Sequence, residues 1–378
     1  MKKAVPQNVL DAFANYEPGI PEHPAGEITV HAINGGLINH SYKISCRLKP
    51  SFLLQQLNKR VFANPQDVQE NYVRLWEYAE SARKRPGEKM ASLHLPIPVY
   101  CGKKTTIFVD NHENYWRAFE FIEESRMLTV AKRPAQAKAT AMAFAGFTAA
   151  FEHFKTGLLK EVIPGFHDLG YRYEQLEEAL KSENYERMAR ALPLINELKD
   201  RERYRHFYDL ITESTEFPKR VMHHDAKIAN VLFSKKDARV MSLVDFDTVM
   251  PGYFFSDLGD MIRSMVCSHD ENSTAFDEIS IRGEFYEAIV NGYLEIIGKQ
   301  LTGPEKKYIH YAGLLMIYMQ ALRFLTDYLN NDVYYKTDYP EQNLARAKNQ
   351  LILLKKLEEY LSNRYQLTAY LSDAISDL

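Results

Sequence analysis

The stretch that decides the fold is VMHHDAKIANVLF, residues 221–233, which is followed along the chain by LVDFD, residues 243–247. Between them lies the turn-forming sequence SKKDA, residues 234–238, with short apolar segments on either side. Two such segments around a polar turn predict a β-hairpin. A hairpin would bring Asn230 and Asp245 close together at its open end, although they are distant in sequence.

The polar residues of these two stretches have the spacing of the catalytic loop and the metal-binding aspartate of kinases. Phosphoryl transfer needs a carboxylate beside the attacking hydroxyl and hard oxygen ligands for Mg²⁺, because the protein acts mainly by positioning and by neutralising charge. We therefore expect Asp225 to accept the hydroxyl proton, and Asn230 and Asp245 to bind Mg²⁺. We expect His223 to brace the loop, and Lys227 to meet the transferring phosphate.

Two other interpretations of this motif are open. The His-His-Asp sequence could be a polar turn before a strand, with Asp245 and Asp247 as solvated acids at a strand end; the predicted hairpin argues against this. A zinc site could use His223, His224 and Asp225. Adjacent residues on an extended segment point to opposite faces, however, and the sequence offers no third ligand at a suitable spacing.

The rest of the chain predicts an α+β protein of two lobes, residues 1–122 and 123–378. Short apolar or alternating segments predict an N-terminal antiparallel sheet with one helix, and longer 3.6-residue periodicities predict a mainly helical C-terminal lobe. The expected strands are 28–33, 42–48, 52–57, 97–100 and 105–109, with the helix at 64–83. The expected later helices are 134–154, 173–181, 185–212, 282–297, 304–329 and 341–361.

Composition restricts the partners and the compartment. A net charge of -3 argues against a nucleic-acid binder that relies on bulk positive potential. The 3 cysteines are widely spaced and lack a ligand pattern, so we expect neither disulfides nor a zinc site, and a cytoplasmic location. We find no export signal. We also expect no membrane span, because Gln320 and Arg323 interrupt the most apolar stretch, residues 311–325.

The catalytic-loop sequence and the LVDFD segment resemble those of the aminoglycoside phosphotransferase and choline kinase superfamily. Within this superfamily, the chain most closely resembles the bacterial N-acetylhexosamine 1-kinases. The resemblance covers nearly the whole chain. Beyond the catalytic loop it rests on GGLINHSYKI from Gly35, FLLQQLN from Phe52, EVIPGFHDLGYR from Glu161, LVDFDTVMPGYFFSDLGDMIR from Leu243 and RFLTDYLNNDVYY from Arg323. It implies a bilobal protein-kinase-like fold that holds ATP between the lobes, and a hydroxyl substrate against the helical lobe.

The resemblance also assigns a nucleotide site. Small residues in the loop at Gly35 and Gly36 would let backbone N–H groups approach the ATP phosphates, although a Gly-Gly pair is equally typical of a simple hairpin turn. The segment RAFEFIEES would connect the lobes and meet adenine; the alternative is an ordinary strand between domains. The residues expected to bind the nucleotide are Gly35, Gly36, Asn39, Ser41, Gln55, Glu120 and Ile122.

One strand departs from the kinase pattern. FLLQQLN has Gln55 and Gln56 where most kinases place the lysine that pairs with the α- and β-phosphates, and we align Gln55 with that lysine. An amide can donate to a phosphate oxygen but carries no charge, so affinity for ATP would depend more on Mg²⁺, on the glycine loop, and on Lys59 or Arg60. The departure also puts in doubt a salt bridge from this strand to Glu70.

The acceptor site is expected in segments rich in Arg, Asp and Tyr, which can form bidentate hydrogen bonds to vicinal hydroxyls and pack an aromatic face against a sugar ring. A solvated helix end is the alternative. Besides Asp225, the candidates are His167, Arg172, Arg323, Asp327, Asp332 and Tyr335. Asp257 and Asp260 are expected to buttress the catalytic loop, with Arg263 paired to one of them.

The function expected from the resemblance is phosphorylation of the anomeric hydroxyl of an N-acetylhexosamine, with a small-molecule sugar as the partner. One alternative is a kinase of choline, ethanolamine, another amino alcohol or an aminoglycoside, with the tyrosines 334, 335 and 339 around a cation. A second is a nucleotide-binding pseudokinase, suggested by the missing lysine. The sequence does not distinguish among sugars and does not give the oligomeric state.

Overall fold

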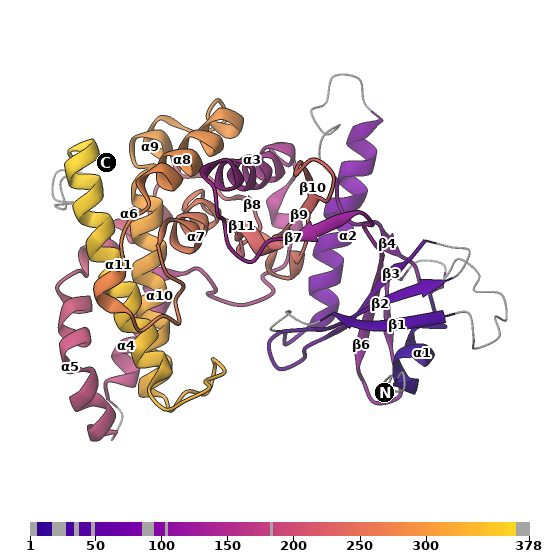
Figure 1. Ribbon diagram of the computed structural model, residues 1–378, viewed down its shortest axis with the longest axis horizontal. Helices are drawn as coiled ribbons and strands as arrows, with labels where there is room; N and C mark the ends of the chain where they lie inside the picture. The colour runs from indigo at the N-terminus through magenta and orange to yellow at the C-terminus, as the bar shows by residue number, and fades with distance from the viewer. Residues whose placement is uncertain are drawn as a thin grey trace. The chain divides into compact units, whose positions relative to one another are not determined.

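The computed structural model describes residues 6–16, 28–33, 38–46, 50–84, 94–102, 105–181 and 184–367. The chain forms two compact units, each assembled from separate stretches of sequence. The first unit comprises Met1–Met127, His153–Pro164 and Asn230–Pro251. The second comprises Leu128–Glu152, Gly165–Ala229 and Gly252–Leu378. Antiparallel sheet dominates the first unit and helices dominate the second, which confirms the predicted α+β class (Figure 1).

The first unit is built on a six-stranded antiparallel sheet in the order β1-β2-β3-β6-β4, with β5 also paired to β6. Its strands are β1 (Ile28–Ile33), β2 (His40–Cys46), β3 (Phe52–Leu57), β4 (Pro98–Val99), β5 (Ile107–Val109) and β6 (Tyr115–Glu120). β6 is central, and its first half was not expected as a strand. An unexpected helix, α1 (Gln7–Phe13), packs Val9, Ala12 and Phe13 into the same apolar core as Trp116.

Helix α2 (Pro65–Arg83) packs a further set of buried side chains near β6. Proline at its first turn fits the fixed φ needed there, and Val68, Tyr72, Leu75 and Ala79 form one buried stripe at helical spacing. The Tyr72 ring lies 5.2 Å from the ring of Phe119 on β6. The helix predicted at 64–83 is therefore confirmed.

The predicted hairpin is also confirmed, as β9 (Val231–Ser234) and β10 (Val240–Leu243). It is not an isolated pair, because β7 (Ser125–Met127) adds a third antiparallel strand against β9. At the open end, the Val244 N–H donates to the Asn230 carbonyl at 3.0 Å. This bond brings the segment carrying Asp245 next to Asn230 in the backbone ladder.

The second unit is organised around α10 (Tyr311–Leu329), which packs against α4, α7 and α11 (Figure 1). Every residue of α10 except Arg323 is buried. The surrounding helices are α3 (Pro134–Ala150), α4 (Leu169–Ala179), α5 (Tyr185–Lys199), α6 (Arg203–Glu213), α7 (Phe255–Val266), α8 (Gly283–Ile297), α9 (Gly303–Lys307) and α11 (Gln342–Tyr365). The short strand β8 (Arg220–Met222) precedes the catalytic loop, and β11 (Met250–Gly252) ends where the second unit resumes. Of the helices in the described ranges, none combines the length and the apolar character needed to cross a bilayer.

Two expected helices are each interrupted. The helix predicted at 185–212 is divided into α5 and α6, and the one predicted at 304–329 is divided into α9 and α10. The first break has no proline or glycine to announce it. Arg201 and Arg203 at the break both pair with Glu358 on α11, at 3.2 and 2.9 Å, so a tertiary contact favours the turn.

Candidate active site

The loop that carries Asp225 follows β8 in the second unit and is held by Asp257 from the first turn of α7. The Asp257 carboxylate accepts the His223 N–H at 2.9 Å and the His224 N–H at 2.7 Å. Asp257 is completely buried, and burial raises the pKa of its carboxyl to about 7 although the two N–H donors act to lower it. The expected buttressing role of Asp257 is confirmed.

His224 has a strained backbone. Its φ of 64° lies in the left-handed region that favours glycine. Its ring is held where a Cβ atom at Gly252 would lie only 2.5 Å away, so glycine is required at position 252. The ring Nδ1 is 2.7 Å from the Ser256 hydroxyl. Such strain persists where the surroundings over-determine a conformation, which is typical of functional loops.

The predicted catalytic residues lie in this loop. The Lys227 Nζ is 2.9 Å from the Asp225 carboxylate, and both side chains are partly exposed. His223 is fully buried, and its ring packs edge-on against Phe144 at a centroid distance of 5.1 Å. The His223 side chain therefore contributes packing, while its backbone N–H ties the loop to Asp257. Asp260 pairs with Arg263 at 2.9 Å, as expected for one of the two acids of α7.

The nucleotide residues predicted in the first unit can be located in part. Gly35 and Gly36 lie outside the described residues. The Asn39 side chain, which follows them, donates to the Asp247 carboxylate at 2.5 Å and accepts the Asn58 N–H at 3.0 Å. On the neighbouring strands, the Gln55 amide donates to the Ser41 hydroxyl at 3.0 Å. The structure thus brings Ser41 and Gln55 together and ties Asn39 to the segment after β10.

The residue that sequence reasoning missed is Arg117 on β6. It pairs with Gln55 in the register of β3 and β6, and its Nε and Nη2 atoms donate to the Gln55 Oε1 at 3.0 and 2.9 Å. The same Nη2 forms an ion pair with Asp247. Only 3% of the Arg117 side chain and 4% of the Asp247 side chain are exposed. A prediction of β6 as the neighbour of β3 would have revealed this pairing.

The remaining predicted nucleotide contacts are backbone groups. The Glu120 N–H donates to the Ile97 carbonyl at 2.9 Å, and the Ile122 carbonyl accepts the Ser125 hydroxyl at 2.6 Å. Their contact with adenine stays a prediction. Glu70 on α2 pairs with Lys160 at 3.0 Å instead of with β3, which agrees with the doubt raised by Gln55.

The predicted metal ligands lie at the open end of the hairpin. Asn230 is buried, and Asp245 has a left-handed φ of 66° immediately before the 3₁₀ turn Phe246–Thr248. An amide oxygen and a carboxylate oxygen are hard donors, and Mg²⁺ in such sites commonly takes one or two protein ligands together with substrate phosphates. The residue types and their place at one end of the hairpin fit a divalent cation.

In the second unit, the structure brings four of the predicted acceptor residues together. His167 precedes α4, Arg172 is on α4, Arg323 is on α10 and Tyr335 follows α10. The Arg323 guanidinium lies 4.9 Å from the centre of the Phe166 ring and 5.6 Å from that of Tyr335. The Phe166 ring stacks on His167 at 4.5 Å. We call Phe166, His167, Arg172, Arg323 and Tyr335 the acceptor cluster.

The acceptor cluster carries positive charge that no carboxylate in the described residues pairs with. The Arg172 guanidinium donates to the Phe166 carbonyl at 3.2 Å and to the Gln175 amide oxygen at 2.8 Å. Arg323 donates to the Gln320 amide oxygen at 3.2 Å. Within the part of the chain that the structure describes, neither arginine forms an ion pair, and both are half-buried. Burial and the charge of Arg323 lower the pKa of Arg172 to about 10.

The acceptor cluster adjoins the catalytic loop through His167. Its Nδ1 is 2.5 Å from the Ser256 hydroxyl and 3.2 Å from the His224 Nδ1. Burial, and then His224, Arg323 and Arg172, lower the pKa of His167 well below its usual value. His167 is therefore neutral at pH 7. A chain of contacts thus joins the residue before Asp225 to the acceptor cluster.

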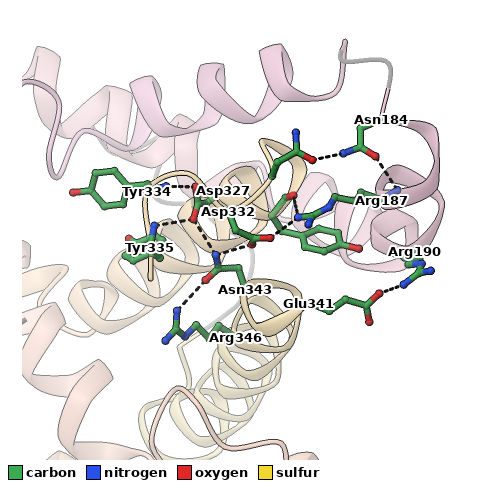
Figure 2. Close-up of polar contacts among 12 residues, drawn as sticks. Asn184, Arg187, Arg190, Asp327, Asp332, Tyr334, Tyr335, Glu341, Asn343 and Arg346 are labelled. Atoms are coloured by element: carbon green, nitrogen blue, oxygen red, sulfur yellow. Dashed lines mark hydrogen bonds and ion pairs between the residues drawn. The ribbon is translucent and has the colours of Figure 1, made fainter. Parts of the chain in front are cut away.

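Asp327 and Asp332, the other two predicted acceptor residues, hold protein groups. Asp327 accepts the backbone N–H groups of Tyr334 and Tyr335 at 2.8 and 2.9 Å, and the Asn343 amide at 2.9 Å (Figure 2). The carboxylate is buried, so these bonds fix the loop that carries both tyrosines. Direct contact between Asp327 and the substrate stays a prediction.

Asp332 belongs to the same network. It accepts the Arg187 Nη1 from α5 at 2.6 Å and the Asn343 amide from α11 at 2.9 Å (Figure 2). Its φ of 59° is left-handed, as is that of Asn331 beside it. Three helices are thereby tied to one loop, which positions Tyr335 in the acceptor cluster.

Comparison with known proteins identifies the class. Residues 54–302, more than half of the 378 residues, match the model of the phosphotransferase enzyme family, APH. The chain belongs to this family, and it is a phosphotransferase that acts on a hydroxyl acceptor. This confirms the resemblance to the superfamily.

Solved structures support the fold. An aminoglycoside phosphotransferase from Alicyclobacillus acidocaldarius matches with a TM-score of 0.60 and 13% identity, over 96% of this chain and 98% of that one. Amicoumacin kinase in complex with AMP-PNP, Ca²⁺ and Ami matches with a TM-score of 0.58 and 13% identity, over 93% of each chain. A choline kinase from Cryptosporidium parvum matches with a TM-score of 0.53 and 16% identity, over 96% of this chain and 97% of that one. At these identities the likeness supports a kinase-like fold without selecting an acceptor.

Proposed function

We propose that the protein transfers the γ-phosphoryl group of ATP, with Mg²⁺, to the anomeric hydroxyl of an N-acetylhexosamine, giving the sugar 1-phosphate. The observation that carries this choice of acceptor is the pair Arg172 and Arg323 without a carboxylate partner in the described residues. A half-buried guanidinium needs acceptor oxygens. An acetamide carbonyl and vicinal hydroxyls supply such oxygens, in a geometry that matches the planar guanidinium fork.

The same arginines argue against an ammonium acceptor such as choline, ethanolamine or an aminoglycoside. A cation brought to this cluster would meet like charge in a site of low dielectric, which is unfavourable. Tyr334 and Tyr335 could enclose a cation, but Arg323 already lies 5.9 and 5.6 Å from their ring centres. An uncharged sugar can instead place its ring against Phe166 or Tyr335.

The residues of the catalytic loop fit the chemistry of transfer. Asp225 would accept the proton of the attacking hydroxyl, and an anomeric hydroxyl is more acidic than an ordinary alcohol, so an unmodified carboxylate suffices as the base. Lys227, beside Asp225, would meet the transferring phosphoryl group. The divalent cation, held by Asn230 and Asp245, would neutralise charge on the phosphates when bound.

ATP as the phosphoryl donor, and the cytoplasm as the cellular location, are proposed from less specific observations. Amicoumacin kinase holds AMP-PNP and Ca²⁺, which supports ATP and a divalent cation here. Cys101 and Cys267 are free and buried, as is common in a reducing cytoplasm, where we place the enzyme.

An acceptor panel tests this proposal. Purified protein with Mg²⁺-ATP would be given N-acetylglucosamine, N-acetylgalactosamine, glucose, choline, ethanolamine and an aminoglycoside, and ADP release would be read above the rate without acceptor. We expect turnover with an N-acetylhexosamine, absent in Asp225→Asn, and a product whose phosphorus signal couples to the anomeric proton. Turnover confined to the amines would contradict the proposed acceptor. Nucleotide binding without any turnover would favour a pseudokinase.

A further inference from the structure

The first unit has a positive charge next to the position where the kinase lysine is missing. In kinases the lysine of the third strand pairs with the α- and β-phosphates and is itself held by a glutamate. Here that strand carries Gln55, and its hydrogen-bonded neighbour β6 carries Arg117 directly opposite. The positively charged residue is therefore on the neighbouring strand of the same sheet.

The surroundings of Arg117 are those of a positioned cation. Gln55 presents its oxygen to the Arg117 Nε and Nη2, and Asp247 pairs with Nη2, so one edge of the guanidinium is fixed by two partners. The Nη1 atom of Arg117 makes no hydrogen bond to any residue in the described ranges. The fork is thus oriented by the protein and keeps donor capacity for a ligand oxygen.

The ion pair reproduces the charge balance of the usual lysine and glutamate. Arg117 and Asp247 together are neutral, so the site can remain buried without a nucleotide. Asp247 also accepts the side chain of Asn39, which follows the glycine pair at 35–36. The Gln55 amide in turn donates to Ser41. The same two residues that orient Arg117 therefore also hold the two side chains expected to donate to the phosphates.

We propose that Arg117 supplies the positive charge that the strand lysine gives to the nucleotide phosphates in other kinases, and that Asp247 and Gln55 position it. The assignment rests on the proposed use of ATP. It predicts that the contribution of Arg117 to affinity grows with the number of phosphates on the ligand, because the interaction is with phosphate charge and not with the base.

Binding measurements on the full chain test the assignment without any acceptor. Dissociation constants for ATP, ADP and adenosine would be measured by calorimetry in EDTA, so that protein groups alone bind the phosphates. We expect Arg117→Gln to weaken ATP binding by about 10- to 100-fold, ADP binding by less, and adenosine binding not at all. Arg239→Gln, at an arginine 83% exposed on the β9–β10 turn, is the matched control and should change none of the three.

Further variants separate a phosphate contact from a structural role. Arg117→Lys keeps a partner for Asp247 and should retain most of the ATP affinity even if Arg117→Gln folds poorly. Gln55→Lys combined with Arg117→Gln returns the charge to β3 and should restore ATP binding to within about tenfold of wild type. Asp247→Asn keeps an oxygen that can accept from the Arg117 Nη2 and leaves Arg117 charged, so ATP affinity should fall by much less than in Arg117→Gln.

Three results would overturn the assignment. One is an equal loss of ATP and adenosine affinity in Arg117→Gln, and another is an unchanged ATP affinity in that variant. A third is a loss in Asp247→Asn as large as that in Arg117→Gln, which would mean that the ion pair is purely structural. A wild-type chain that bound no ATP at all would instead overturn the proposed donor, and the assignment with it. None of these outcomes depends on which sugar is the acceptor.

Discussion

Two sets of arginines in this enzyme differ in how their charge is balanced. In the first unit, Arg117 is almost completely buried and forms an ion pair with Asp247, while Gln55 accepts from the same edge of the guanidinium. In the second unit, Arg172 and Arg323 are half-buried and, among the described residues, have only amide and carbonyl oxygens as hydrogen-bond partners. The charge of the first site is balanced within the protein, whereas the charge of the second has no carboxylate partner among the described residues.

This difference indicates how each site should be studied. A buried charge without a partner is costly, so a protein usually pairs it or leaves it for a ligand. Substitution of the arginine that is paired with a buried carboxylate should therefore reduce stability in addition to any effect on ligand binding, whereas substitution of an arginine without a carboxylate partner should leave stability nearly unchanged. Matched substitutions at the two sites test this distinction, and substitutions of two acids in the catalytic region complete the comparison.

The largest effect is expected at the carboxylate beside the acceptor cluster. Asp225→Asn removes the proton acceptor, so kcat should fall by about 10²- to 10⁴-fold. ATP affinity and the melting temperature should change little, because the Asp225 side chain is partly exposed. Steady-state kinetics with calorimetric ATP binding check both. A variant that retained more than a tenth of the wild-type kcat would remove Asp225 from its assigned role.

Next comes the direct comparison of the two arginine sites by stability. Arg117→Met leaves Asp247 buried and unpaired, which should lower the free energy of unfolding by about 3–5 kcal/mol. Arg323→Met is the matched substitution in the acceptor cluster. It should lower the free energy of unfolding by at most about 1 kcal/mol, because it leaves no buried carboxylate without a partner. Urea unfolding of both variants gives the two values. Equal losses would break the distinction between the sites.

Asp257 offers the converse case, a buried carboxylate that has no cationic partner in the described part of the chain. The pKa of Asp257 is raised to about 7 in the folded protein. Between about pH 4 and pH 7, the folded protein therefore keeps the Asp257 carboxyl protonated, whereas the unfolded chain releases this proton. The stabilising contribution of that proton is therefore complete below pH about 4 and is lost as the pH rises to about 7.

Asp257→Asn should abolish this decline with pH. It should also cost about 1–3 kcal/mol, because the amide cannot accept from both loop N–H groups. Urea unfolding across this pH range, compared between the variant and the wild type, measures the slope. A wild-type stability that rose with pH as steeply as that of the variant would contradict the account.

The smallest effect is electrostatic. Burial lowers the pKa of His167, with further lowering by His224, Arg323 and Arg172. Arg323→Gln removes one of these charges, so the His167 pKa should rise towards its usual value. Titration of the ring by NMR measures the shift, with Arg239→Gln as the control. An unchanged His167 pKa would contradict the effect assigned to the charge of Arg323.

Sequence patterns located the elements of the site that depend on local spacing. The hairpin and the strand at 52–57 are observed where periodicity and turn residues placed them. The candidates His167, Arg172, Arg323 and Tyr335 do converge in space. Local hydrophobic period and turn chemistry suffice for such elements, because neighbours along the chain determine them.

The features that escaped prediction depend on tertiary contacts. Arg117 was part of an expected connection between lobes, and only the pairing of β3 with β6 shows that it faces Gln55. The break between α5 and α6 depends on Glu358, more than a hundred residues away. The residue type of Asp327 suggested that it binds the sugar. Its hydrogen bonds to the backbone N–H groups of Tyr334 and Tyr335 could not be predicted from the spacing of residues in the sequence.

The most direct test of the central claim uses two acceptors that differ at one substituent. N-acetylglucosamine carries an acetamide where glucosamine carries an amine, which is protonated below neutral pH. Among the described residues, Arg172 and Arg323 have no carboxylate partner. Their charges predict that kcat/KM for N-acetylglucosamine exceeds that for glucosamine by about 100-fold or more, and that Arg323→Gln reduces this ratio. A wild-type enzyme that phosphorylated glucosamine as efficiently as N-acetylglucosamine would contradict the claim that these arginines select the acceptor.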